Sequence, residues 1–193
     1  MNVSRETARL EKLAALVRKW SPAINLVAPA TLDAIEARHI DDSRQLVRLA
    51  RSATGDWLDL GSGGGFPGLV VAICRPDLSV TLVESDARKC SFLRIAGREL
   101  DLANLRILHG RIEAIPPQSA ANLSARALAP LPDLLSYVGR HLGPQGRAWL
   151  MKGRNWQDEV AQARKDWSFD MNVHPSTTDP GASILEITGP SHV

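Results

Sequence analysis

Hydrophobic and polar positions follow two different periods along the chain, and the period changes near residue 54. Before that point apolar side chains recur every three or four residues, at Leu10, Leu13, Val17 and Trp20. This spacing predicts an amphipathic helix. Ser21-Pro22 predicts its end, because the residue before a proline avoids the α region. Further helical stretches are predicted from Thr31 onward and over residues 42–51, so residues 1–54 are expected to form an all-helical extension.

From residue 56 onward, short apolar runs alternate with segments of helical period. The runs predict strands over residues 57–60, 78–83, 105–108, 121–125 and 147–151. The helical segments cover residues 69–74, 86–100, 131–142 and 155–166. Two last runs, 169–173 and 183–187, predict a closing antiparallel pair. Because strands that alternate with helices form a mostly parallel sheet, we expect one doubly wound α/β domain over residues 55–193.

The most informative segment is a run of glycines directly after the first predicted strand. It reads Leu58-Asp59-Leu60-Gly61-Ser62-Gly63-Gly64-Gly65-Phe66-Pro67-Gly68. Glycine lets the backbone turn sharply and approach a bound molecule closely, and a following helix presents free N–H groups. Glu84 ends the second predicted strand, where a carboxylate can accept hydrogen bonds from both hydroxyls of a ribose. Together these features predict a cofactor that contains adenosine.

Two classes of adenosine cofactor remain open for this loop. Glycines 63, 65 and 68 match the G-x-G-x-x-G fingerprint of NAD-binding proteins, so an NAD-dependent oxidoreductase is one alternative. Pro67 stands where a pyrophosphate needs a backbone N–H, which proline lacks. We expect Asp59 at the mouth of the loop, where its charge would repel a phosphate and attract an amino group or a sulfonium. Both residues favour S-adenosylmethionine.

The end of the fourth predicted strand indicates the methyl acceptor. It reads Ser124-Ala125-Arg126-Ala127-Leu128-Ala129-Pro130, without the Asn/Asp-Pro-Pro-aromatic run of many amine methyltransferases and without a Pro-Cys pair. This segment fits an acceptor atom whose lone pair is already available, such as guanine N7. Arg126 is expected to donate to the guanine edge, while catalysis rests on alignment of acceptor, methyl and sulfur. A surface ion pair is the alternative role for Arg126.

Composition and charge exclude few classes of binding partner. The 193 residues carry 23 Lys and Arg against 21 Asp and Glu, a formal net charge of +2, which alone predicts no polyanionic partner. Basic residues nevertheless gather in the helical extension and in residues 86–111, where we expect a phosphate-binding face. The two cysteines lack a metal-ligand spacing, so no metal site is expected. Without a signal core or a long apolar run, the chain is expected in the cytoplasm.

These motifs together resemble the bacterial glucose-inhibited division protein B family, the guanine-N7 methyltransferases of small-subunit ribosomal RNA. Beside the glycine run, the resemblance rests on Lys19-Trp20, Asn25-Leu26, Arg38-His39-Ile40-Asp41-Asp42-Ser43, Arg88-Lys89, Phe92-Leu93, Ser124-Ala125-Arg126-Ala127 and Leu150-Met151-Lys152-Gly153. It implies a Rossmann-like S-adenosylmethionine-dependent methyltransferase fold with an N-terminal helical extension. It also implies 16S ribosomal RNA or the small ribosomal subunit as partner, and we expect a monomer. A non-catalytic RNA-binding module is a further alternative.

The resemblance implies the site residues as well. The family's cofactor contacts fall on Gly61, Phe66, Ile112, Glu113 and Arg126, to which the motifs above add Gly63, Gly65 and Glu84. The basic residues implicated in catalysis fall on Arg111, Arg126 and Lys152. The extension with His39 and Asp42 is expected to form part of the RNA side. A role in capping a helix is an equal alternative for His39.

Overall fold

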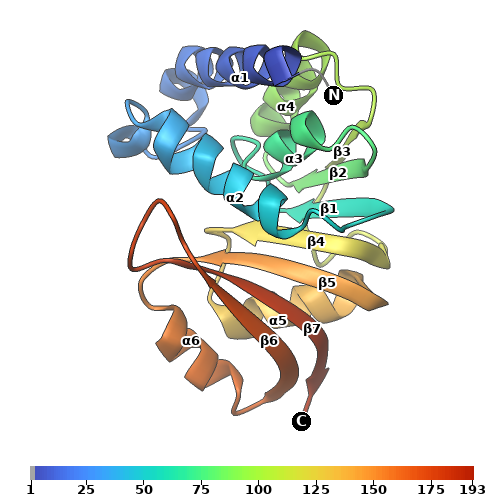
Figure 1. The fold of residues 1–193 in the computed structure, drawn as a ribbon. Helices are drawn as coiled ribbons and strands as arrows, with labels where there is room; N and C mark the ends of the chain where they lie inside the picture. The colour runs from blue at the N-terminus through green and yellow to red at the C-terminus, as the bar shows by residue number, and fades with distance from the viewer. Residues whose placement is uncertain (1–2) are drawn as a thin grey trace.

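A sheet of seven strands in the order β3-β2-β1-β4-β5-β7-β6 forms the centre of the computed structural model, which describes residues 3–193 (Figure 1). The strands are β1 Asp56–Leu60, β2 Ser79–Glu84, β3 Leu105–His109, β4 Ala120–Arg126, β5 Leu142–Lys152, β6 Trp167–Pro175 and β7 Ser183–His192. Strands β1 to β5 pair in parallel, and β7 pairs antiparallel with both β5 and β6. The predicted doubly wound α/β class and its closing antiparallel pair are confirmed.

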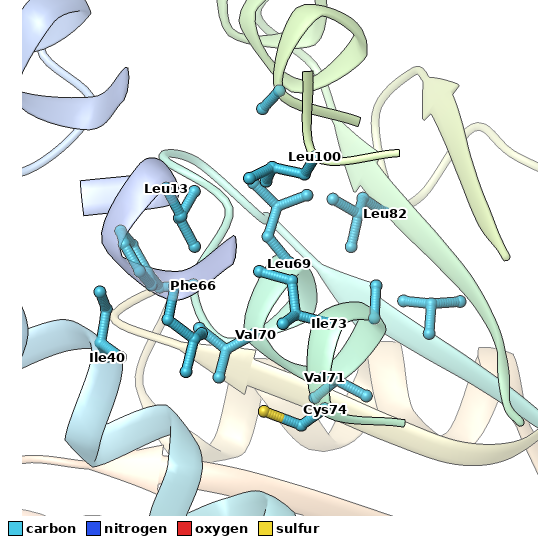
Figure 2. Packing of buried hydrophobic residues seen from close by; sticks show 14 of the residues in the cluster. Leu13, Ile40, Phe66, Leu69, Val70, Val71, Ile73, Cys74, Leu82 and Leu100 are labelled. Atoms are coloured by element: carbon cyan, nitrogen blue, oxygen red, sulfur yellow. The ribbon is translucent and has the colours of Figure 1, made fainter. Parts of the chain in front are cut away.

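Helices cover both faces of the sheet, each face with its own hydrophobic cluster (Figure 1). The helices are α1 Val3–Ile24, α2 Asp42–Leu49, α3 Gly68–Cys74, α4 Ala87–Glu99, α5 Leu131–His141 and α6 Trp156–Ala163, with a 3₁₀ turn η1 Pro29–Thr31 and a π-helical turn η2 Glu36–Asp41. The cluster under α3 and α4 also contains side chains from the N-terminal helices. Figure 2 shows Leu13 of α1 and Ile40 of η2 beside Leu69 and Val70 of α3. The extension therefore shares the core of the α/β domain.

Two details of the extension differ from the sequence prediction. Pro22 does not end the first helix, because it lies in the last turn, where its missing N–H removes a single hydrogen bond. The helix ends at Ile24, and Asn25 adopts the left-handed conformation (φ 49°) that commonly follows a helix terminus. The helix expected from Thr31 is also wrong. Thr31 closes a 3₁₀ turn, and helical structure resumes only at Glu36.

Ion pairs hold the extension against the end of α4. Arg5 and Arg9 both contact the carboxylate of Asp101, at 2.8 and 3.0 Å, and Lys12 Nζ lies 2.8 Å from Glu99. Such exposed pairs contribute little to stability individually. They do neutralise cations that the sequence placed on a phosphate-binding face, so this part of the extension offers less free positive charge than expected. Within residues 3–193, none of the helices combines the length and apolar character that a membrane crossing requires.

Candidate active site

A cavity of about 980 Å³ opens at the carboxyl ends of the central strands. This is the place where strand order reverses around β1, with β2 on one side and β4 on the other, and where doubly wound sheets bind ligands. Its volume lies at the upper end of the usual range for small-molecule sites. The cavity is lined by nearly all the predicted site residues: Gly61, Gly63, Phe66, Glu84, Arg111, Ile112, Glu113, Arg126 and Lys152.

The glycine loop forms one wall of this cavity. Gly61 and Gly63 have φ of +64° and +55°, a region that side chains disfavour. A Cβ on Gly61 would lie 2.6 Å from Leu128 Cδ1, so glycine is needed where the loop approaches the segment after β4. Gly65 faces the other way: a Cβ there would overlap Leu69 of α3. Gly65 therefore packs against α3 behind the loop, away from the cavity, and its role is structural.

Glu84 is held in place by backbone N–H groups around its carboxylate. Its Oε1 accepts hydrogen bonds from Ser85 N and Asp86 N, both at 2.8 Å, and Oε2 accepts one from Gly63 N at 2.8 Å. An ionised carboxylate has about four acceptor positions. One therefore stays open, on Oε2 beside the glycine loop, rather than the two that a grip on both ribose hydroxyls needs. The carboxylate still fits an adenosine cofactor, through one hydroxyl.

Replacing Glu84 by alanine tests this contact. Loss of a hydrogen bond to a buried charged acceptor costs about 1–3 kcal/mol, so binding of S-adenosylhomocysteine is expected to weaken roughly 5- to 150-fold. Calorimetric titration measures the dissociation constant. Glu99→Ala is the control: it removes the same charge on the remote end of α4 and should bind like the wild type. An unchanged dissociation constant for Glu84→Ala would remove the assignment.

Asp59 lies in the core and not at the mouth of the loop, which corrects the sequence prediction. The residue is fully buried on β1, where its Oδ1 accepts a hydrogen bond from Ser124 Oγ at 2.6 Å. Ser124 Oγ in turn accepts one from Trp57 Nε1 at 2.9 Å, so the three side chains link β1 to β4. The expected attraction of Asp59 for a cofactor amino group at the entrance is therefore wrong.

The burial of Asp59 makes a pH-dependent contribution to stability. Burial raises its pKa to about 6 from 3.8, against the lowering effect of the Ser124 hydrogen bond. Between pH 4 and 6 the unfolded chain has lost this proton while the native state keeps it, so stability falls as pH rises through this window. The difference in unfolding free energy between Asp59→Asn and wild type should therefore grow by on the order of 3 kcal/mol from pH 4 to 7. Urea titrations measure it, and a difference independent of pH contradicts it.

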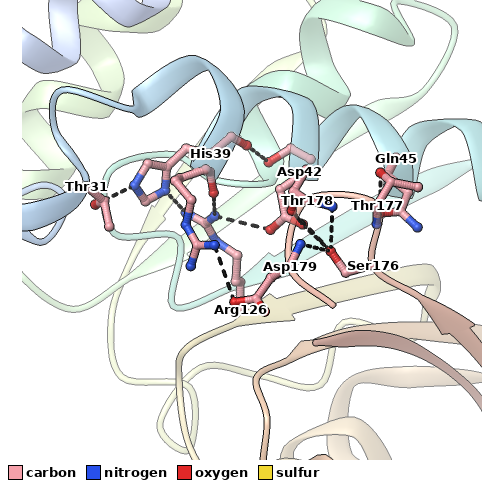
Figure 3. Close-up of polar contacts among 11 residues, drawn as sticks. Thr31, His39, Asp42, Gln45, Arg126, Ser176, Thr177, Thr178 and Asp179 are labelled. Carbon is pink, nitrogen blue, oxygen red and sulfur yellow. Dashed lines mark hydrogen bonds and ion pairs between the residues drawn. The ribbon is translucent and has the colours of Figure 1, made fainter. Parts of the chain in front are cut away.

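Arg126 ends β4 and is fixed by groups of the helical extension (Figure 3). Its Nη2 lies 2.6 Å from His39 Nδ1, and its Nη1 donates to the backbone oxygen of Arg38 at 3.2 Å. Burial lowers the pKa of His39 to about 4, and the charges of Arg126 and Arg38 act in the same direction. His39 is thus neutral at pH 7, with Nδ1 as acceptor and Nε2 donating to Thr31 Oγ1 at 2.8 Å.

Phe66 supports the same arginine from the glycine loop. The guanidinium carbon of Arg126 lies 5.4 Å from the centre of the Phe66 ring, within range of a cation–π contact. The His39 and Phe66 rings are 5.2 Å apart. The alternative role of Arg126 as a surface ion pair does not fit this environment, and His39 acts as an acceptor for Arg126 rather than as a helix cap.

The sequence prediction missed a second group of cavity residues, on the loop between β6 and β7. In this loop, Thr178 Oγ1 donates to Asp42 Oδ1 at 3.0 Å, and Ser176 Oγ lies 3.5 Å from the same oxygen (Figure 3). Gln45 binds the loop outside the cavity, with Nε2 donating to Pro175 O at 2.7 Å and Oε1 accepting from Thr177 N at 2.8 Å. The loop thereby joins the extension and closes one end of the cavity.

The three basic residues expected in catalysis occupy different places. Lys152 Nζ donates to Ala129 O at 2.9 Å and lies 2.5 Å from Glu159 Oε2, so it braces the segment after β4. Arg126 also lines the cavity, and on the sheet it pairs with Met151, the residue before Lys152. Arg111 follows β3, which is three strand spacings from β4, about 14 Å. Its exposed side chain lies 3.7 Å from Glu113. The structure therefore brings Arg126 and Lys152 together and leaves Arg111 at the far rim.

Ile112 and Glu113 lie on the side of the cavity beyond Glu84. Ile112 is buried, and its backbone oxygen accepts a hydrogen bond from His141 Nε2 at 2.9 Å. Glu113 is half exposed and accepts one from the Tyr137 hydroxyl at 2.8 Å. An apolar side chain beside polar acceptors suits a nucleobase. Among residues 3–193, no group of three or more His, Cys, Asp and Glu side chains converges as a metal site requires.

Solved structures of several methyltransferases share this fold. The glycopeptide N-methyltransferase MtfA complexed with sinefungin superposes with a TM-score of 0.65 at 13% identity, over 79% of this chain and 87% of that one. A SAM-dependent methyltransferase from Aquifex aeolicus gives a TM-score of 0.63 at 12% identity, over 86% of this chain and 96% of that one. The expected Rossmann-like methyltransferase fold is thereby confirmed.

Sequence comparisons identify the family. A protein of Paracoccus denitrificans (strain Pd 1222) named Ribosomal RNA small subunit methyltransferase G is 64% identical over 192 residues, covering 100% of both chains. One of the same name from Cereibacter sphaeroides (strain ATCC 17025) is 49% identical over 198 residues, covering 100% of this chain and 95% of that one. The family model described as GidB, rRNA small subunit methyltransferase G, matches residues 6–186. The chain therefore belongs to the GidB family of rRNA small subunit methyltransferase G proteins, as its motifs predict.

Proposed function

We propose that this protein transfers a methyl group from S-adenosylmethionine to N7 of a guanine in 16S ribosomal RNA. One observation carries the proposal: a single cavity is lined by the glycine loop after β1, by Glu84 at the end of β2 on one side of it, and by Arg126 at the end of β4 on the other side. The relatives named as ribosomal RNA small subunit methyltransferases supply the substrate class. We propose that the protein acts as a monomer, in the cytoplasm, on the RNA or on the small subunit.

Each end of the cavity has its own task in this proposal. Glu84 Oε2 accepts one ribose hydroxyl, and Ile112 and Glu113 surround the adenine, while the Gly61–Gly63 turn lets the backbone approach the cofactor closely. When bound, S-adenosylmethionine supplies an electrophilic methyl group on a sulfonium sulfur. Guanine N7 carries an in-plane lone pair and needs no general base, so the enzyme has to align the base and exclude other geometries.

The basic residues then position the target base and the RNA, and none of them transfers a proton. Arg126 donates to the target base from a guanidinium that His39 and Phe66 hold still. Lys152 fixes the segment after β4, through Ala129, against which the base would lie. Arg111 is exposed at the far rim and suits an RNA phosphate better than the base.

Methyl transfer to small subunits from a strain that lacks this protein tests the proposal. Purified protein and S-adenosylmethionine with a labelled methyl group are incubated with those subunits and, separately, with their free RNA. We expect about one methyl group per 16S RNA in at least one arm. Because N7-methylguanosine carries a positive charge, reduction followed by aniline cleaves the RNA at the modified nucleotide and maps it. Label at another atom, or none in either arm, contradicts the proposal.

The alternatives give different results in two simple measurements. An NAD-dependent oxidoreductase would be stabilised against heat by NADH and not by S-adenosylhomocysteine. A non-catalytic RNA-binding module would bind the RNA without incorporating label. We expect stabilisation by S-adenosylhomocysteine alone, together with incorporation.

A further inference from the structure

Methylation at N7 restricts how a guanine can be held. An arginine that reads guanine commonly donates to O6 and N7 together. Here the N7 lone pair must stay free to attack the methyl group, so an arginine can use O6 only. The base then has to be recognised through N1–H and the 2-amino group, both of which are donors and need an acceptor on the protein.

Asp42 provides such an acceptor next to Arg126. Its Oδ2 forms an ion pair with Arg126 Nη1 at 3.6 Å, a separation longer than a hydrogen bond. The two side chains are only 18% and 17% exposed, and both line the cavity. Each is fixed by other partners: Arg126 by His39 and the backbone of Arg38, and Asp42 through Oδ1 by Thr178. A guanidinium donor and a carboxylate acceptor thus lie side by side, and each can still form a hydrogen bond to a third group.

We propose that Asp42 selects the target guanine, with Oδ2 accepting from N1–H and the 2-amino group while Arg126 donates to O6. This inference rests on the proposed function. On the edge of guanine, O6 lies between N7 and N1, so a base held in this way directs N7 away from Asp42. Adenine would set its 6-amino group against Arg126 and its N1 lone pair against Asp42, and both contacts are repulsive.

The same contact strengthens during the reaction. N7 donates its lone pair to the methyl carbon while the carbon–sulfur bond breaks and its electron pair stays on sulfur. The guanine ring gains a positive charge, which makes N1–H and the 2-amino group better donors to a carboxylate. An interaction that is stronger in the transition state than in the ground state raises the rate and does not merely improve binding.

A double-mutant cycle between Asp42 and the base tests the contact. Wild type and Asp42→Asn are assayed in single turnover on 16S RNA that carries either guanosine or inosine at the mapped position. Inosine keeps N7, O6 and N1–H but lacks the 2-amino group. In the variant, the amide oxygen stays with Thr178, which places the NH₂ group where Oδ2 faces the base. Wild type should prefer guanosine by roughly 10- to 100-fold, whereas the variant should show less than about a threefold preference.

Gln45→Ala is the control that distinguishes a loss of base recognition from a general loosening of the structure. Gln45 binds the same β6–β7 loop but lies outside the cavity, so a general loosening should lower the rates on guanosine and inosine by one common factor. Equal loss on both bases for Asp42→Asn would overturn the inference, and binding of S-adenosylhomocysteine checks that the variant is folded. If the wild type methylates no guanine at N7, the proposed function itself fails. If it does and the preference of Asp42→Asn stays at the wild-type value, only the role of Asp42 fails.

Discussion

Arg126→Ala is expected to lower the single-turnover rate of methyl transfer by about 10²- to 10³-fold, the usual effect of removing one preorganised donor at a reaction centre. The guanidinium is held by His39 Nδ1, by the backbone of Arg38 and by the face of Phe66, so its orientation is fixed before the base binds. The alanine variant also leaves Asp42 without the cation beside it. Quench experiments with labelled S-adenosylmethionine measure the rate.

Arg126→Lys shows whether charge alone is sufficient. An ammonium keeps the positive charge but lacks the planar fork that bonds His39 and the base at the same time. We expect this variant to stay at least about tenfold below the wild type. Full activity with lysine would mean that Arg126 acts only as a point charge, and the geometry described above would then be irrelevant to the rate.

Gly65→Ala is expected to cost roughly 2–5 kcal/mol of unfolding free energy. Two effects add: the φ of +91° is strained for any side chain, by about 1–2 kcal/mol, and overpacking against Leu69 costs about 1–3 kcal/mol. Gly63→Ala is the matched control. Its φ of +55° carries the same strain, but the nearest atom to its Cβ is Gly61 O at 3.8 Å, so about 1–2 kcal/mol is expected.

Urea denaturation of both variants measures the difference. Equal losses would mean that Leu69 moves aside freely and that Gly65 is needed for its backbone conformation alone. A loss of cofactor binding in Gly65→Ala at unchanged stability would instead mean that Gly65 contributes to the cofactor site, as the sequence predicts.

The cavity wall formed by the glycine loop and Glu84 could be predicted because these residues are close together in the sequence. The loop follows one strand and Glu84 ends the next, and parallel strands bring their carboxyl ends to one edge. Asp59 could not be placed in the same way. It is next to the loop in sequence, but its side chain belongs to a strand that is buried on both faces. There its Oδ1 accepts a hydrogen bond from Ser124, which in turn accepts one from Trp57.

The acceptor side was only partly predictable. Arg126 could be found from its place at a strand end. Its contact with His39 could not, because His39 accepts a hydrogen bond only when its ring is neutral, and burial is what keeps it neutral. Thr178 and Asp42 are 136 positions apart, and no local pattern connects them. The loop between β6 and β7 reaches the extension only because β7 inserts between β5 and β6, and the sequence predicted the antiparallel pair without its position in the sheet.

A crystal structure with S-adenosylhomocysteine tests most directly whether this cavity binds the cofactor between Glu84 and Arg126. We expect the ribose within hydrogen-bond distance of Glu84 Oε2, the adenine against Ile112 and the sulfur directed toward the end of β4. A molecule bound elsewhere, with the space beside the glycine loop empty, would contradict both the site and the proposed reaction.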